Sequence, residues 1–138
     1  MDEKLESRIG RFKESWAYNV RQRGTELHSY ARDGGIADSL ARSLGMYTRA
    51  TVETELYWRF RDDFGESISG RVDAKTLENA LRNYTAHVKE RLNTAGNYLV
   101  RAEESGQRMR AYEEMRACEE VMEDLQHNFP EYVAKGWR

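Results

Sequence analysis

The sequence contains a single proline, Pro130, and therefore lacks the residue that most often interrupts a helix. It also contains no run of about 18 apolar residues, and no apolar core for a secretion signal follows Met1. Apolar residues recur three or four positions apart along most of the chain, which is the spacing of one helix face. These features predict an all-α, cytoplasmic protein that does not enter a membrane.

Motifs for catalysis and metal binding are also lacking. Cys118 is the only cysteine, so no internal disulfide can form, and its place on an apolar stripe predicts a small core residue. His28, His87 and His127 lie on three different predicted helices, and none follows a glutamate at the spacing of a carboxylate-bridged metal site. The chain has no Gly-x-Ser-x-Gly segment and no phosphate-binding lysine loop. We expect no catalytic residues, metal, cofactor or small-molecule substrate.

Residues that usually build a core are scarce, since Leu, Ile, Val and Phe make up only 24 of the 138 residues. A share this low indicates disorder only when the net charge is high, and the net charge here is −2. Eight Tyr, three Trp and five Met supply part of the missing apolar area, and these residue types are common where proteins meet. We therefore expect a protein partner or a homo-oligomer. An ordinary amphipathic core is the alternative.

The balance of charge gives little support for nucleic-acid binding, because 22 basic residues face 24 acidic ones. Arginine nevertheless outnumbers lysine by 17 to 5. A guanidinium forms forked hydrogen bonds with carboxylates as well as with phosphates. We predict that arginines pair with carboxylates on neighbouring helices.

The first predicted helix runs from about Asp2 to Arg32 and ends at Asp33-Gly34-Gly35, where glycine can adopt the left-handed cap conformation. Its apolar side consists of Leu5, Ile9, Phe12, Trp16, Val20, Leu27 and Tyr30. An unbroken helix of this length spans roughly 45 Å. Because that is long for a small bundle, we interpret it as a further sign of a partner helix.

Residues 36–64 contain two apolar trios whose directions differ by roughly 160° on a helical wheel. The first trio is Ile36, Leu40 and Leu44, and the second is Val52, Leu56 and Phe60. One straight helix would point the two trios to nearly opposite sides. We therefore predict two helices joined by a turn at Gly45-Met46-Tyr47, with Thr48 capping the second helix.

The segment GIADSLARSLGMYTRATVETEL, residues 35–56, resembles a helix-turn-helix motif. The resemblance rests on the small Ala41 in the first helix, Gly45 at the turn and Val52 on the inner side of the second helix. Val52 comes one residue later than the motif usually has. The resemblance implies DNA binding, as in a transcriptional regulator or a viral packaging subunit, and its candidate contacts are Tyr47, Arg49, Thr51 and Thr54.

The same stretch can also form one helix that is apolar nearly all round and lies between partners. The segment Tyr57-Trp58-Arg59-Phe60-Arg61 combines the residue types that are most enriched in binding hot spots. An interior position is the simpler interpretation for Phe60. The candidate partner-binding residues are Trp16, Tyr57, Trp58, Arg61 and Trp137.

A loop from Phe64 to Arg71 separates residues 1–64 from a predicted antiparallel helical hairpin over residues 72–129. Asp73 is the predicted N-cap of the third helix, and Val72 can pack on Leu77 beside it. The apolar stripe of this helix consists of Leu77, Leu81, Tyr84, Val88, Leu92, Ala95, Leu99 and Ala102. A turn at Ser105-Gly106 precedes the fourth helix, Gln107 to Phe129, and a single kinked helix is the alternative.

Pro130 ends the fourth helix, and residues 130–138 form an aromatic tail that we expect to cover its own bundle. The sequence thus predicts a single helical domain, residues 1–138, of four to five helices with a long N-terminal helix and a C-terminal hairpin. Our leading hypothesis is a non-enzymatic interaction module that serves as an adaptor, inhibitor or oligomeric scaffold. DNA binding through residues 36–56 is the alternative.

Overall fold

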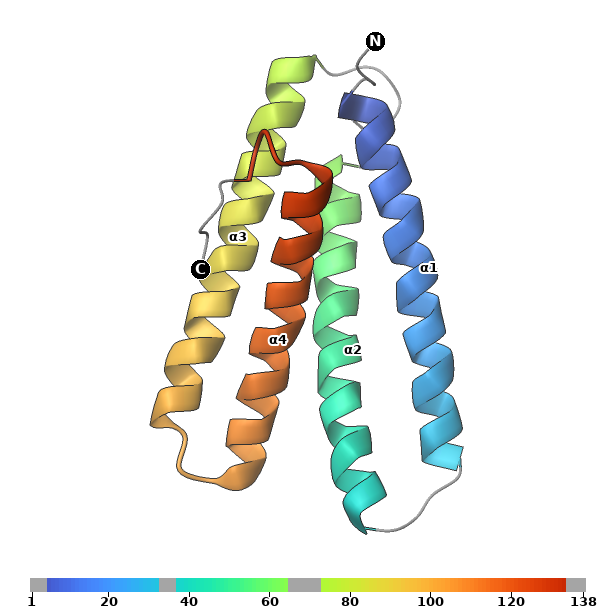
Figure 1. The fold of residues 1–138 in the computed structure, drawn as a ribbon, viewed down its shortest axis with the longest axis vertical. Coiled ribbons are helices and arrows are strands. Elements are labelled where there is room, and N and C mark those ends of the chain that lie inside the picture. The colour runs from blue at the N-terminus through green and yellow to red at the C-terminus, as the bar shows by residue number, and fades with distance from the viewer. Residues whose placement is uncertain (1–4, 33–36, 65–72, 134–138) are drawn as a thin grey trace.

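The computed structural model describes residues 5–32, 37–64 and 73–133, with side chains described outside residues 23–32 and 37–44. Four helices lie side by side in this part of the chain (Figure 1). They are α1 (Leu5–Arg32), α2 (Ala37–Phe64), α3 (Ala74–Arg101) and α4 (Ser105–Asn128). The described residues contain no strand. The predicted all-helical bundle is confirmed, with four helices rather than five.

The predicted turn at Gly45-Met46-Tyr47 is wrong, because all three residues lie inside α2. Ile36 lies outside the described residues, and the side chains of Leu40 and Leu44 are not described. The buried face of α2 continues straight through residues that are small or polar. It consists of Gly45, Val52, Glu53, Leu56, Phe60 and Phe64. A comparison of apolar residues alone therefore predicted a break where the buried face is continuous.

Gly45 is a buried position of α2 that faces α4 and does not form a turn. A methyl group at this position would lie 3.5 Å from the Glu113 side chain of α4, which is an ordinary contact distance, so the packing does not require glycine here. α1 is a long helix, but its length does not set it apart, because α1, α2 and α3 each have 28 residues. The length of α1 alone therefore gives no reason to expect a partner helix.

The predicted start of α3 and the predicted end of α4 are confirmed. Asp73 adopts extended backbone geometry, and its Oδ1 accepts a hydrogen bond of 2.8 Å from the backbone N–H of Thr76. α4 ends at Asn128, two residues before Pro130. The break between α3 and α4 comes slightly earlier than predicted, at residues 102–104. The two helices then run side by side in opposite directions (Figure 1).

The core is centred on aromatic rings, which explains how the chain folds with few aliphatic residues. Phe60 lies at the middle of this aromatic cluster, with its ring centroid 4.5 to 5.7 Å from those of its neighbours. Such separations allow tilted and edge-to-face contacts. The cluster consists of Phe12, Trp16, Phe60, Phe64, Tyr84 and Phe129. Leu56, Leu81, Val88, Met122 and Leu125 surround it.

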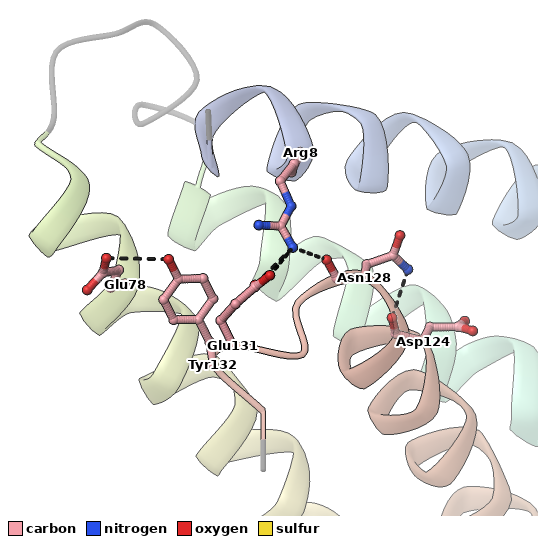
Figure 2. Close-up of polar contacts among 6 residues, drawn as sticks. All are labelled: Arg8, Glu78, Asp124, Asn128, Glu131 and Tyr132. Carbon is pink, nitrogen blue, oxygen red and sulfur yellow. Dashed lines mark hydrogen bonds and ion pairs between the residues drawn. The ribbon is translucent and has the colours of Figure 1, made fainter. Parts of the chain in front are cut away.

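The described part of the C-terminal tail packs on its own bundle, as predicted (Figure 2). Arg8 of α1 donates hydrogen bonds to the backbone carbonyl of Asn128 at 2.5 Å and to Glu131 at 3.0 Å. Tyr132 donates to Glu78 of α3 at 3.4 Å, and Val133 is buried. These contacts connect the end of α4 to both α1 and α3. Residues 134–138, including Trp137, lie outside the described residues.

The described helices include none with a stretch both long enough and apolar enough to span a bilayer.

Candidate interaction surface on helix α2

The predicted partner-binding residues occupy two different environments. Trp16 lies in the core with 8% of its surface exposed, and the half-buried Tyr57 packs against it at 5.9 Å between ring centroids. Trp58 is 49% exposed, and the Arg61 guanidinium lies 4.2 Å from the centroid of its ring. Of the described residues in this predicted set, Trp58 and Arg61 are exposed and Tyr57 is partly accessible. Trp137 lies outside the described residues.

The predicted DNA-contacting residues are also divided. Tyr47 is 62% exposed, but Arg49 points toward α4, where it pairs with Glu120 and lies 3.9 Å from Glu113. The Thr51 hydroxyl donates to the carbonyl of Tyr47 at 2.8 Å, within its own helix. The hydroxyl of Thr54 makes the same type of bond, 2.7 Å long, with the carbonyl of Ala50. Of these four side chains, Arg49 belongs to a contact between helices and the other three lie on the outer side of α2.

Accessible residues from both predicted sets fall on one line along α2, which we call the outer stripe. It consists of Tyr47, Thr51, Thr54, Trp58 and Arg61. The steps of four, three, four and three residues keep these positions on one helix face, opposite Val52, Leu56 and Phe60. Because both threonine hydroxyls are bonded within the helix, their methyl groups contribute apolar surface between the two aromatic residues.

A groove of about 450 Å³ lies beside the outer stripe, between α2 and the beginning of α4. Its lining comes from three helices and consists of Tyr47, Thr48, Thr51, Val52, Glu55, Arg91, Gly106, Met109, Arg110 and Glu114. The Tyr47 ring, the Val52 methyl groups and the Met109 side chain give it an apolar character. Tyr47 and Thr51 belong both to the stripe and to the groove, so the two features form one surface.

Arg91 of α3 closes one side of this groove by connecting three helices. Its Nε lies 3.0 Å from Glu114 of α4, and its Nη2 lies 2.5 Å from Glu55 of α2. Burial opposes the charge of Arg91, but the hydrogen bonds that Arg91 donates to the two carboxylates, together with their negative charges, outweigh it and raise the pKa of Arg91. The pairing predicted between arginines and carboxylates on neighbouring helices is thus confirmed for Arg49 and Arg91, whereas Arg8 pairs with Glu131 of the C-terminal tail.

Two other hollows are present among the described residues. One, of about 290 Å³, lies between α3 and α4 beside Tyr98, and it shares Arg110 and Glu114 with the groove. The other, of about 380 Å³, lies between α1 and α4 and has a polar lining that includes Arg11 and Asp124. The hollow beside Tyr98 also has an exposed aromatic residue, since Tyr98 is 49% exposed, as is Trp58 near the groove.

The histidines and the cysteine considered from the sequence do not come together in the described residues. No group of three His, Cys, Asp or Glu residues in this part of the chain could hold a metal ion. His87 is half-buried and His127 is exposed, and the side chain of His28 is not described. Cys118 is fully buried, and burial raises the pKa of its thiol to about 12, so the thiol stays protonated at neutral pH.

The groove was not predicted from the sequence, because its lining comes from segments more than fifty residues apart. The outer stripe had a detectable signal. The steps between Tyr47, Thr51, Thr54, Trp58 and Arg61 are visible once residues 37–64 are treated as one helix. Because a turn was predicted at Gly45, the first three residues were assigned to the DNA-binding hypothesis and the last two to the partner-binding hypothesis. Their common helix face was therefore not recognised.

Comparison with known proteins assigns the chain to no family. No protein-family model, no curated protein and no solved structure matches it.

Proposed function

We propose that this chain is a non-enzymatic helical interaction module that binds a protein through the outer stripe of α2. The observation that carries the proposal is the arrangement of Trp58 and Tyr47, two exposed aromatic residues three helical turns apart on one face. The groove beside Tyr47 adds a concave surface to this convex face. Whether the module acts as an adaptor, an inhibitor or an oligomeric scaffold depends on which protein it binds.

Trp58 and Arg61 have the chemistry expected at the centre of such an interface. The stacked guanidinium covers one side of the indole and keeps the ring in a defined orientation. A partner that covers the exposed part of Trp58 would gain apolar burial without first ordering a flexible side chain. Truncating a tryptophan at an interface centre typically costs about 2 kcal/mol of binding free energy or more.

DNA binding through residues 36–56 remains the alternative, although the contacts that the candidate DNA-binding residues make within the protein favour protein binding. Arg49 is engaged with Glu120 on α4, and the threonine hydroxyls are bonded to their own helix. Glu55 lies beside the stripe and would repel phosphates. We expect no salt-dependent binding to duplex DNA. A measurable affinity that Arg49→Ala weakens would favour the alternative instead.

A pair of tyrosines allows a matched test of the proposal. Tyr47 and Tyr18 are both 62% exposed, but only Tyr47 lies on the outer stripe. We would replace each in turn by a photoreactive benzoylphenylalanine, irradiate the full-length protein in native cell extract, and identify crosslinked peptides by mass spectrometry. We expect a defined protein partner from position 47 and none from position 18.

The same experiment includes a variant that separates specific from random contacts. Adding Trp58→Ala to the position-47 probe should reduce the crosslink at least fivefold, because the indole supplies most of the interface. Equal yields from positions 47 and 18, or a crosslink that is insensitive to Trp58→Ala, would refute the proposal.

A further inference from the structure

α2 carries a projecting residue and a hollow on the same exposed side, a fixed distance apart. Trp58 projects from the outer stripe, and the groove opens beside Thr51. The two positions are seven residues apart, which is about 10 Å along a helix and nearly two full turns. They therefore face almost the same direction.

This arrangement is self-complementary. When two such helices lie antiparallel with Thr54 opposite Thr54, Trp58 of each copy comes within one residue, about 1.5 Å along the axis, of Thr51 of the other and lies at the mouth of its groove. A two-fold interface brings one surface patch onto itself, so each projecting residue must meet a hollow at the mirrored position. Trp58 and the groove satisfy this condition, and the small Thr54 between them lets the helix axes approach.

We propose that the partner of the outer stripe is a second copy of this chain, bound antiparallel about a two-fold axis near Thr54. The inference rests on the proposed function, because it names the partner of the same surface. Trp58 of each copy is the buried anchor, and the groove beside Thr51 is its receptor. The apolar side chains of Val52 and Met109 line that groove and suit an indole.

The antiparallel arrangement also gives Arg61 a partner. Arg61 stacks on Trp58 and makes no ion pair with the described residues. With Thr54 opposite Thr54, Arg61 of each copy lies opposite Tyr47 of the other, whose ring is 62% exposed. The guanidinium can therefore contact that ring.

The dimer should be weak, because four helical turns bury less surface than the roughly 1,600 Å² of a standard interface. We expect a dissociation constant on the order of 100 µM. Sedimentation equilibrium of the full-length protein up to millimolar concentration measures it directly. Trp58→Ala should weaken the dimer at least tenfold, whereas Tyr18→Ala, which removes an exposed aromatic residue on α1, should leave it unchanged. A strictly monomeric wild type would overturn the inference.

A cysteine at the proposed axis tests the register. Thr54→Cys should form an intermolecular disulfide under mild oxidation, because the two copies of residue 54 face each other. Asn93→Cys, exposed on α3, is the matched control and should not, and the buried Cys118 does not compete. Thermal unfolding of each variant verifies the fold. Equal crosslinking of the two variants would overturn the antiparallel arrangement.

The two proposals fail in distinguishable ways. A crosslink from position 47 to a different protein, together with a monomeric purified chain, refutes the second-copy inference and leaves the interaction module standing. No crosslink from position 47 to any protein, this chain included, refutes both.

Discussion

The two halves of the bundle differ in the contacts that their described residues make. The half where α2 ends and α3 begins contains the aromatic cluster around Phe60 and Tyr84. In the other half, where α3 connects to α4, the described buried residues include Ala95, Ala102 and Ala111. Arginines there pair with glutamates of neighbouring helices. This ionic half also contains the groove.

This difference separates stability from binding. Burial of large rings contributes several kcal/mol per residue, whereas partly exposed ion pairs contribute little. The groove lies in the ionic half, beside the ion pairs that Arg91 makes with Glu55 and Glu114. We infer that the aromatic half sustains the fold and so allows the ionic half to remain open. Four substitutions test this division, and they are described in order of decreasing expected effect.

Phe60→Ala should have the largest effect, because the ring is fully buried at the centre of the aromatic half. We expect a loss of about 3–5 kcal/mol in the free energy of unfolding, as is typical when a buried phenylalanine is truncated. Tyr47→Ala removes a ring of similar size from the ionic half and should change stability by no more than about 0.5 kcal/mol. Urea unfolding monitored by circular dichroism measures both. Similar losses for the two variants would show that the halves do not differ.

Tyr84→Phe should have a smaller effect in the same half. The Tyr84 hydroxyl donates a buried hydrogen bond of 2.8 Å to the backbone carbonyl of Leu56, and its loss should cost about 1 kcal/mol. Burial also raises the pKa of Tyr84 well above its usual value of 10.0. The fold therefore favours the protonated hydroxyl, and wild-type stability should fall as the pH rises above 10. The variant should lose less stability over that range, and unfolding at pH 9 and pH 11 compares the two.

Arg91→Met should have a modest effect on stability and a clear dependence on salt. It removes the ion pairs with Glu55 and Glu114, whose side chains are 54% and 31% exposed, so solvent screens them. We expect a loss of about 1 kcal/mol at low ionic strength that shrinks in 1 M salt. Arg82→Met, on the exposed side of α3, is the control and should be neutral at both salt concentrations. A loss of stability that does not change with salt would mean that Arg91 acts through packing instead of charge.

The contrast between the halves also explains how much could be predicted from the sequence. The stripe of α3 and the Asp73 cap were predicted correctly, because Leu77, Leu81 and Tyr84 are apolar residues that face one core. The continuity of α2 was missed, because its buried face includes Gly45 and Glu53, which do not appear in an apolar pattern. The apolar periodicity of the sequence therefore identifies the buried positions of the aromatic half but not those of the ionic half.

The candidate surface was predicted in part for the same reason. Trp58, Arg61 and Tyr47 were selected by residue type, which is a local property of the sequence. Their alignment on one helix face required α2 to be continuous, and the groove required three helices to meet. Trp16 has the same residue type as Trp58, but its position in the core depends on α1 packing against α2.

His87 lies where the two halves meet, on α3 between Tyr84 and Arg91. Partial burial lowers the pKa of His87 below its usual value of 6.5, and the nearby charges of Arg59 and Arg91 lower it further. The carboxylates of Asp63 and Glu90 act in the opposite direction but do not outweigh these effects. The fold therefore disfavours the protonated imidazole.

A histidine with this shift makes stability depend on pH in one direction. The unfolded chain begins to bind a proton below about pH 6.5, while the folded chain resists it, so wild-type stability should fall as the pH decreases from 6.5. His87→Gln removes the titrating group and should flatten this slope, whereas the same substitution at the exposed His127 should leave it unchanged. Urea unfolding at pH 7.5, 6.5 and 5.5 measures the slope for each protein. Because the imidazole is only partly buried, this is the smallest of the four effects, and a slope that persists in His87→Gln would assign the pH dependence to other groups.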